Sequence, residues 1–256
     1  MTAILFDVGD TLVGFPVASW DEVDRASIQA LHAALRRPLA DGTRLDGTLP
    51  GQSELLGAFR EAIVEARRRT APRLQELRAR EVLRETLRRS GILVSEAALN
   101  GLERVWAEPR LAIRRVYPEV PEVIPALQQR GVRLGLISNI WVSGYIVREH
   151  LDALGLLRPF EAVVLSSDIG FVKPHRVLFE IALEAMGVEP AEAWYVGDTP
   201  HADVAGAKGA GMGAVLVDRP ASARFDPSPP ADIPPYGGPD PDAVIRDLRG
   251  LLSLVS

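Results

Sequence analysis

Short apolar runs of strand length recur along the chain, and each run ends in small or polar residues. Five such runs occupy residues 3–8, 132–138, 162–167, 193–197 and 214–217. Segments with apolar residues three and four positions apart, as in helices, lie at residues 121–130, 143–154, 177–186 and 201–209. This alternation is typical of an α/β fold with a doubly wound parallel sheet, which helices cover on both faces. Ligands bind at the carboxyl ends of such strands, so polar residues there are candidate site residues.

Residues 15–114 break this pattern, because no run in them resembles a strand. Helical periodicity instead covers residues 20–36, 53–70, 73–90 and 95–110. An interval rich in Gly, Asp and Thr, residues 38–51, is predicted to form a mobile connection. We therefore expect residues 15–114 to fold as an α-helical bundle, inserted into an α/β core made of residues 1–14 and 115–256.

The C-terminal part of the core contains a proline-rich stretch. Residues 219–242 hold eight prolines, which predicts a surface loop with one short strand at residues 231–233. Beyond it, apolar residues at helical spacing predict a closing helix over residues 241–252.

The charge balance excludes one class of partner. The chain has 29 lysine and arginine residues against 34 acidic ones, a formal net charge of −5. Proteins that bind nucleic acid through phosphate neutralisation carry a concentrated basic face, so we expect no nucleic-acid partner. The arginines at residues 67–69 are interpreted as part of a solvated helix face that nearby glutamates pair with.

Cysteine is absent, which excludes disulfides, thiolate nucleophiles and cysteine metal sites. The N-terminal residues lack the pattern of a signal peptide, and no apolar run is long enough to span a membrane. The sequence therefore predicts a cytoplasmic protein with no membrane partner. It does not predict an oligomeric state.

Polar residues stand where three of the expected strands end. Asp7, Ser138 and Asp198 each follow an apolar run, and Asp203 lies five residues beyond Asp198, in a loop that enters a predicted helix. Two carboxylates at that spacing can serve one ion, one of them directly and the other through water. Oxygen ligands that retain water suit Mg²⁺.

Lysine is rare in this chain, since Lys173 and Lys208 are the only two. Lys173 lies in the loop that follows a further strand. A compact ammonium group there can neutralise a phosphate or keep a nucleophilic carboxylate ionised. Because the chain otherwise uses arginine, we interpret Lys173 as a functional residue.

Four segments, taken together and in order, resemble the motifs of the haloacid dehalogenase-like (HAD) hydrolase superfamily, in the branch with a type-1 helical cap. They are FDVGDTL at residues 6–12, ISN at 137–139, GFVKP at 170–174 and GDTPHAD at 197–203. The resemblance covers the whole chain and implies a Rossmann-like catalytic core with residues 15–114 as the cap. It identifies the superfamily but not the substrate.

The resemblance implies a role for each motif residue. Asp7 would be the nucleophile, which attacks phosphorus to give an aspartyl-phosphate that water then hydrolyses. Lys173 would balance the charge on Asp7 and the phosphate. Ser138 would bind a phosphoryl oxygen, and Asn139 and Thr11 would align the phosphate-binding loops.

Mg²⁺ is the cofactor that the resemblance implies. Its expected ligands are the carboxylates of Asp7, Asp198 and Asp203 and the backbone carbonyl of Gly9, with Asp203 acting directly or through water. The substrate would be a small phosphorylated metabolite.

Gly9 departs from the family pattern. Phosphatases of the family usually carry an aspartate two residues after the nucleophile, which protonates the leaving alcohol and then activates water; here that position is glycine. Loss of a general acid typically slows a reaction by about 10² to 10⁴. We expect Asp10 to cap a turn and not to take over this role. His175 and His201 are the other residues near the motifs that could transfer a proton.

Two alternatives to a phosphatase therefore stay open. A 2-haloacid dehalogenase would use the same aspartate without Mg²⁺ and without a leaving-group acid, although that branch does not usually keep the motif at residues 197–203. A catalytically silent protein would keep the phosphate and metal site but not the hydrolysis.

Overall fold

A parallel sheet of six strands forms the centre of the core, in the order β5-β4-β1-β6-β7-β8. The computed structural model describes residues 2–16, 19–45, 49–219 and 236–255. The strands of this sheet are β1 (Ala3–Phe6), β4 (Arg133–Ser138), β5 (Ala162–Leu165), β6 (Ala193–Gly197), β7 (Gly213–Val217) and β8 (Ala243–Ile245). The predicted parallel sheet is confirmed.

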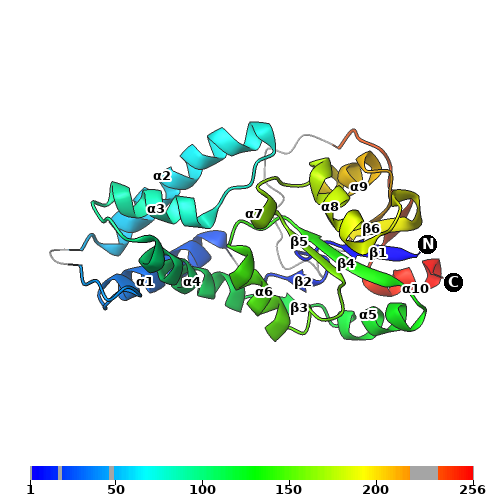
Figure 1. Cartoon of the computed structure of the whole chain (residues 1–256), viewed down its shortest axis with the longest axis horizontal. Coiled ribbons are helices and arrows are strands. Elements are labelled where there is room, and N and C mark those ends of the chain that lie inside the picture. Colours follow the sequence, from blue (N-terminus) through cyan, green and yellow to red (C-terminus); the bar gives the residue numbers. More distant parts are fainter. Residues whose placement is uncertain (1, 17–18, 46–48, 220–235, 256) are drawn as a thin grey trace.

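Helices cover both faces of this sheet (Figure 1). On one face lie α8 (Arg176–Met186) and α9 (Ala205–Gly209), and on the other α5 (Val120–Gln129), α6 (Gly144–Ala153) and α10 (Leu251–Leu254). Shorter helical turns are α7 (Ser166–Ile169), η1 (Ala71–Arg73), η2 (Pro190–Glu192) and η5 (Leu248–Gly250). Successive residues of β1 join the two apolar cores in turn, Ile4 and Phe6 on one face and Leu5 on the other.

The register of β1 decides which residues meet at the sheet edge. Phe6 pairs with Leu136 of β4 and with Val196 of β6. Asp7 directly follows Phe6. It therefore lies at the same edge as the residues that end β4 and β6.

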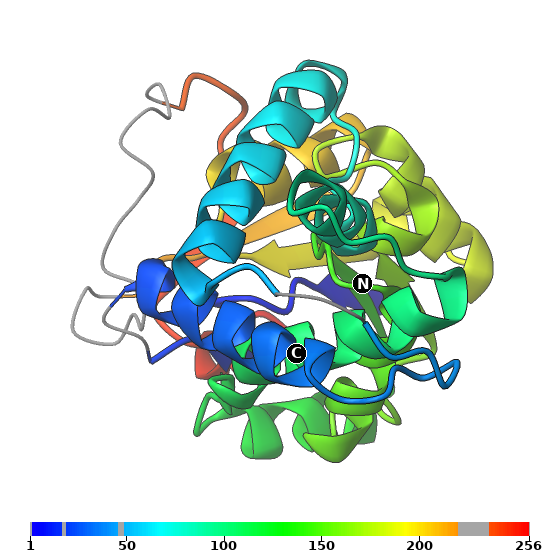
Figure 2. The ribbon, with the colours of Figure 1, turned by 90° about the vertical axis from the view of Figure 1, so that its left-hand side faces the viewer.

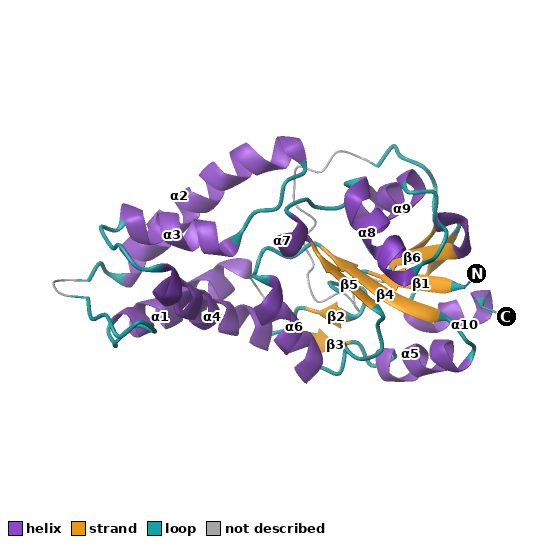
Figure 3. Ribbon diagram, viewed as in Figure 1, coloured by secondary structure: helices purple, strands orange, loops and turns teal. Residues whose placement is uncertain are grey.

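Four helices lie between β2 (Val13–Gly14) and β3 (Arg115–Val116), two short strands that pair antiparallel. They are α1 (Trp20–Leu35), α2 (Gln52–Thr70), α3 (Ala79–Arg89) and α4 (Glu96–Ala112), here called the helical module. α1 packs against α4 and α2 against α3. The module extends from one end of the sheet (Figure 3), and in the view from that end its helices lie in front of the strands (Figure 2). The four predicted helices are confirmed, and the β2–β3 pair adds to the prediction. None of the described helices is long and apolar enough to cross a membrane.

A connector of residues 74–78 explains why α3 begins later than predicted. Leu74 has a left-handed backbone with a φ of 50°, which stops helical continuation. The N–H of Val172 then donates to the carbonyl of Leu74 at 2.8 Å, and the N–H of Glu76 donates to the carbonyl of Gly170 at 2.9 Å. The connector thus forms an extended antiparallel contact with the loop after α7.

The C-terminal segment differs from its prediction. The helix predicted over residues 241–252 is wrong, because the chain forms β8, then η5 and the short α10. The Ala-Val-Ile triplet of β8 pairs with β7 at the edge of the sheet, where β-branched side chains are favoured. Asp247 then accepts a hydrogen bond from the N–H of Arg249 at 2.9 Å and starts η5. The strand predicted at residues 231–233 lies outside the described residues.

Glutamates pair with the arginine-rich faces of the module. Arg69 lies 3.9 Å from Glu65 on α2, and Arg89 of α3 reaches Glu61 of α2 at 2.9 Å. These exposed pairs agree with the interpretation of a solvated helix face.

A buried glutamate ties the helical module to the core. Glu103 of α4 is fully buried, and its carboxylate accepts from the N–H of Ser143 at 2.9 Å and from its hydroxyl at 2.8 Å. Trp106, one turn further along α4, packs edge-on against Trp141 with 5.0 Å between ring centroids. Polar and aromatic contacts therefore join α4 to the same loop before α6.

We expect Glu103→Ala to lower the free energy of unfolding by about 2 kcal/mol, because it leaves two donors of Ser143 without their acceptor. The matched control is Glu149→Ala, which removes an exposed ion pair with Arg104 and should cost less than about 1 kcal/mol. Urea unfolding of the wild type and both variants measures the difference. Equal losses would contradict a special role for the buried glutamate.

Candidate active site

The ammonium group of Lys173 joins residues from separate parts of the sheet edge. It donates hydrogen bonds to Oδ1 of Asp7 at 2.8 Å, to Oδ1 of Asp203 at 2.6 Å and to the hydroxyl of Tyr195 at 2.8 Å. Lys173 is 5% exposed and Asp203 is 1% exposed. An ammonium group has three donors, so these partners use all of them and fix the position of the charge.

The surroundings of Lys173 are themselves held by hydrogen bonds. Asn139 accepts from the backbone N–H of Lys173 at 2.7 Å and donates to its carbonyl at 3.3 Å. Tyr195 of β6 donates its hydroxyl hydrogen to the carbonyl of Ile137 at 2.8 Å, and burial raises its pKa well above the ordinary value. Sequence reasoning missed Tyr195, because a tyrosine inside a strand is more often a packing residue.

Asp203 is positioned by the loop after β6. The loop leads into the π-helical turn η3 (Pro200–Val204), and Oδ2 of Asp203 accepts from the N–H of Thr199 at 2.9 Å. A Cβ atom at Gly197 would overlap this carboxylate, so glycine is the residue that fits there. The helix predicted over residues 201–209 accordingly begins as this π turn and becomes regular in α9.

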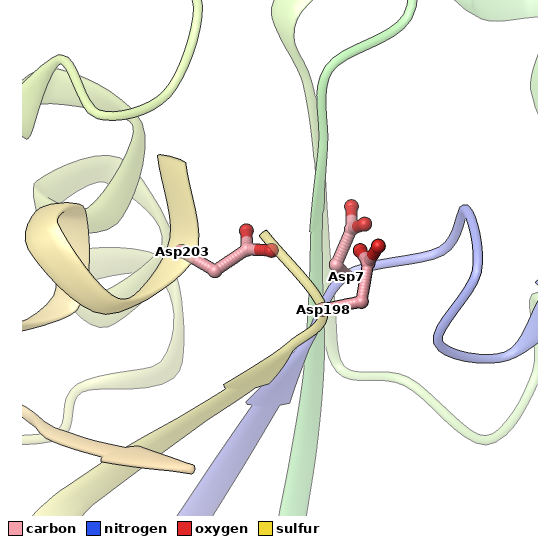
Figure 4. Close-up of side chains that lie close together, drawn as sticks. All are labelled: Asp7, Asp198 and Asp203. Carbon is pink, nitrogen blue, oxygen red and sulfur yellow. The ribbon is translucent and has the colours of Figure 1, made fainter. Parts of the chain in front are cut away.

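Three carboxylates meet at this edge of the sheet. Asp7, Asp198 and Asp203 each offer an oxygen, and these atoms all lie within 4.8 Å of one another. Figure 4 shows Asp7 and Asp198 side by side, with Asp203 pointing toward them. Burial raises the pKa of Asp7 to about 6, although Lys173 opposes the shift. Burial, with repulsion from Asp203 and Asp7, raises the pKa of Asp198 to about 8.

The cluster is short of positive charge. Burial acts to lower the pKa of Lys173, but attraction to Asp203 and Asp7 outweighs it and holds this pKa above the ordinary value. A divalent cation would offset the remaining repulsion, and a set of carboxylate oxygens suits Mg²⁺. Both oxygens of Asp203 already accept hydrogen bonds, which favours contact through water for that residue.

A cavity of about 90 Å³ lies beside Asp7. The predicted site residues that line it are Asp7, Gly9, Ser138, Asn139, Lys173 and Asp203. Thr11 and Asp198 are not among its described lining residues; Thr11 is fully buried, and Asp198 adjoins Asp7. A water molecule needs about 10–15 Å³ of such volume, so the cavity has room for a phosphoryl group and few further atoms.

The first loop, residues 7–12 between β1 and β2, holds Asp10 outside the cavity lining. Asp10 has a φ of 49°, and its carboxylate accepts from the hydroxyl of Tyr117 at 3.4 Å. Arg219 donates to the carbonyl of Thr11 at 2.9 Å and to that of Asp10 at 3.3 Å, and it pairs with Glu119 at 2.6 Å. These contacts agree with a turn-forming role for Asp10. Arg219 had no signal in the sequence.

The two histidines near the motifs contact other side chains. Nδ1 of His175 accepts from the N–H of Val177 at 3.3 Å at the start of α8, and its ring stacks on Phe171. His201 packs edge-on against Tyr236 with 5.1 Å between ring centroids. Neither histidine is among the described residues that line the cavity.

Arg114 is a cavity residue that sequence reasoning missed. It lies between α4 and β3, is 7% exposed, and lines the cavity together with Phe15. The chain contains many arginines, and Arg114 belongs to no motif. No signal in the sequence distinguished it.

Comparisons with known proteins agree with one another. The sequence matches the family model described as haloacid dehalogenase-like hydrolase over residues 1–211. It is 30% identical to the glyceraldehyde 3-phosphate phosphatase of Methanopyrus kandleri over 251 residues, which is 97% of each chain. It is 40% identical to the phosphoserine phosphatase of Thermus thermophilus over 141 residues, or 54% of this chain and 53% of that one.

Solved structures share the fold. A HAD phosphatase from Thermococcus onnurineus has a TM-score of 0.62 at 23% identity, over 100% of this chain and 98% of that one. A 2-haloacid dehalogenase from Pseudomonas syringae has a TM-score of 0.61 at 26% identity, with the same coverage. The fold alone therefore does not distinguish a phosphate ester from a haloacid as the substrate.

Gly197→Ala should lower the free energy of unfolding by about 2 kcal/mol, because the new Cβ displaces the Asp203 carboxylate from Lys173. Gly209→Ala is the matched control, since a Cβ there would meet no other atom within 4 Å. In α9 this change should leave stability unchanged or raise it by up to about 1 kcal/mol. Thermal unfolding of both variants measures the contrast. A Gly197→Ala variant as stable as the wild type would contradict the packing described.

Proposed function

Because the chain belongs to the haloacid dehalogenase-like hydrolase family, we propose that it is a Mg²⁺-dependent phosphatase of a small phosphorylated metabolite. The observation that carries the proposal is the buried contact of Lys173 with both Asp7 and Asp203. This contact brings a nucleophilic carboxylate, a compact cation and acidic oxygens to one cavity. Relatives named as phosphatases of glyceraldehyde 3-phosphate and phosphoserine support a phosphate ester as the substrate.

Asp7 is the nucleophile in the proposed mechanism. One of its oxygens bonds to phosphorus while the bond from phosphorus to the ester oxygen breaks, which gives an aspartyl-phosphate and an alcohol. Water then attacks the phosphorus, releases inorganic phosphate and regenerates the carboxylate. Lys173 donates to Oδ1 of Asp7, and so keeps this carboxylate ionised and oriented.

Positive charge has to offset the repulsion between a carboxylate and a phosphate. When bound, Mg²⁺ supplies that charge. The residues that would hold it are Asp7, Asp198, the carbonyl of Gly9, and Asp203 directly or through water. Ser138 lines the cavity with Asp7, and its hydroxyl would bind a phosphoryl oxygen.

Asn139 and Thr11 act on the phosphate indirectly in this proposal. Asn139 fixes the backbone of Lys173 through its amide group. The carbonyl of Thr11 anchors the first loop to Arg219. Both residues would thus hold the loops that surround the phosphoryl group.

We assign the helical module the role of a cap, with residues 15–114 as the cap and residues 1–14 and 115–256 as the catalytic core. Phe15 and Arg114, near the two crossings between these parts, line the same cavity as Asp7. Movement of the module would therefore open and close the cavity. Closure would exclude water from the reacting phosphate.

Gly9 leaves the departing oxygen without an acid from the first loop. The described lining of the cavity includes no histidine, and its two carboxylates, Asp7 and Asp203, are both engaged by Lys173. The proton for the departing alcohol then comes from water. Esters with poor leaving groups should therefore react slowly.

A second candidate function is 2-haloacid dehalogenation by the same Asp7. Gly9 favours it, because a halide leaves without a proton, and a 2-haloacid dehalogenase shares the fold. The position of Asp198 and Asp203 beside Asp7 favours the phosphatase, because dehalogenation has no use for a divalent cation. Chloride release from 2-chloropropionate in the presence of EDTA separates the two functions.

The wild type should release phosphate from p-nitrophenyl phosphate when Mg²⁺ is present, and EDTA should abolish the release. Asp7→Asn should lower the rate by about 10³-fold or more, because an amide does not attack phosphorus. Asp10→Asn is the control, since it alters a neighbouring carboxylate outside the described cavity lining, and it should change the rate little. Turnover that persists in Asp7→Asn would contradict the mechanism.

Gly9→Asp should raise the hydrolysis of an alkyl phosphate by about 10²-fold, because it supplies an acid to a poor leaving group. A Cβ at residue 9 would lie 3.4 Å from the ring of Phe15, an ordinary contact. p-Nitrophenyl phosphate, with its good leaving group, should respond much less. Gly9→Ala adds the Cβ without the carboxylate and is the control.

The same experiment separates a slowed enzyme from a silent one. If the natural chain is inactive and Gly9→Asp creates activity, the protein is a silent member of the family with an intact scaffold. If Gly9→Asp and Gly9→Ala behave alike, a missing acid is not what limits the rate.

A further inference from the structure

Arg114 is a buried arginine that forms no ion pair within the described part of the chain. Three arginines are buried among the described residues: Arg110, Arg114 and Arg219. Arg110 pairs with Asp24. Arg219 pairs with Glu119 at 2.6 Å. The guanidinium of Arg114 makes no ion pair or hydrogen bond with any described residue, and its Nε is buried without a partner.

Because Arg114 lines the cavity, a ligand bound there could be its missing partner. Arg114 lines the cavity with Asp7 and Phe15. Its guanidinium carbon lies 5.7 Å from the centre of the Phe15 ring. Phe15 in turn lies 3.4 Å from the point where a side chain at residue 9 would begin. Gly9, Phe15 and Arg114 therefore form one wall.

An unpaired charge at this depth costs stability. Burial lowers the pKa of Arg114 to about 10, with Asp7 opposing the shift, so the guanidinium stays charged at neutral pH. Burial and the charge of Arg114 lower the pKa of His150 to about 4, so that side chain is neutral there. A desolvated guanidinium needs an acceptor, and an anion bound in the cavity would supply it.

We propose that Arg114 binds a carboxylate of the substrate, so that the substrate class is a small phosphate ester with a carboxylate on its leaving group. The inference rests on the proposed phosphatase function. Under that function a side chain placed at position 9 would face the leaving group, and Arg114 shares a wall with this position.

The planar shape of the Arg114 guanidinium and the size of the cavity further limit which ligands fit. A planar guanidinium binds a carboxylate through two parallel hydrogen bonds, which an ammonium group does not reproduce. The cavity measures about 90 Å³, so the carbon skeleton between phosphate and carboxylate has to be short.

The test compares two substrates of similar size, 2-phosphoglycolate and 2-hydroxyethyl phosphate, which differ by a carboxylate against a hydroxymethyl group. kcat/KM is measured for the wild type, Arg114→Met and Arg114→Lys, with p-nitrophenyl phosphate as the reference. We expect the wild type to prefer the acid, and Arg114→Met to lower kcat/KM about 10- to 100-fold for the acid alone. Arg114→Lys should recover part of the loss, because it keeps the charge without the planar fork.

A binding measurement makes the test independent of turnover. Asp7→Asn keeps the cavity but not the nucleophile, so phosphate esters should bind without reacting. 2-Phosphoglycolate should raise the melting temperature of Asp7→Asn, and adding Arg114→Met should remove this rise. 2-Hydroxyethyl phosphate should stabilise both proteins equally. Without ligand, Arg114→Met should melt no lower than the wild type, because it removes an unpaired buried charge.

An equal loss for both esters in Arg114→Met would overturn the inference, because Arg114 would then contact the phosphoryl group. A wild type that hydrolyses p-nitrophenyl phosphate without preferring the acid would overturn it too, while the phosphatase function stands. A wild type that hydrolyses no ester, but binds the acid through Arg114, would reject the phosphatase function and keep the carboxylate site. If Arg114→Met does not fold, Arg114→Lys is judged by the same comparison.

Discussion

The buried ammonium group of Lys173 is the interaction on which the site depends. It stands between two carboxylates that would otherwise repel each other, Asp7 after β1 and Asp203 in η3. Removing one member would leave charge uncompensated in a place that water barely reaches. The parallel sheet sets the spacing, because β1 lies between β4 and β6. Hydrogen bonds with Asn139 and Tyr195 then hold Lys173 in place between these two carboxylates. The contacts that hold this edge of the core together are therefore the contacts that the proposed reaction needs.

Charge is balanced differently inside the fold and at the cavity. Within the fold, Arg219 meets Glu119, and the carboxylate of Glu103 meets two donors of Ser143. At the cavity the balance is incomplete. Lys173 pairs with two of three neighbouring carboxylates, and the guanidinium of Arg114 has no partner among the described residues. Buried groups left in such a state are a burden on stability and are commonest where a ligand completes them.

Local patterns predicted most of the fold, because apolar spacing depends on neighbours in the chain. β8 was missed because its strand form depends on an edge of β7 that is remote in sequence. The connector at residues 74–78 is extended for a similar reason, since its backbone bonds to the core. In the site, Lys173 could be predicted from its rarity and its motif. Tyr195 and Arg114 could not, because a strand tyrosine and one arginine among many gain their meaning only from tertiary contacts.

The connector before α3 also changes what the helical module can do. A body attached to another by two crossings, here β2 and β3, can rotate about the line that joins them. The backbone hydrogen bonds of Leu74 and Glu76 to Val172 and Gly170 restrict that rotation. These bonds lie within three residues of Lys173. If the helices move as proposed, they must either break these hydrogen bonds or displace the loop that carries Lys173. Opening of the cavity would then also shift the ammonium group.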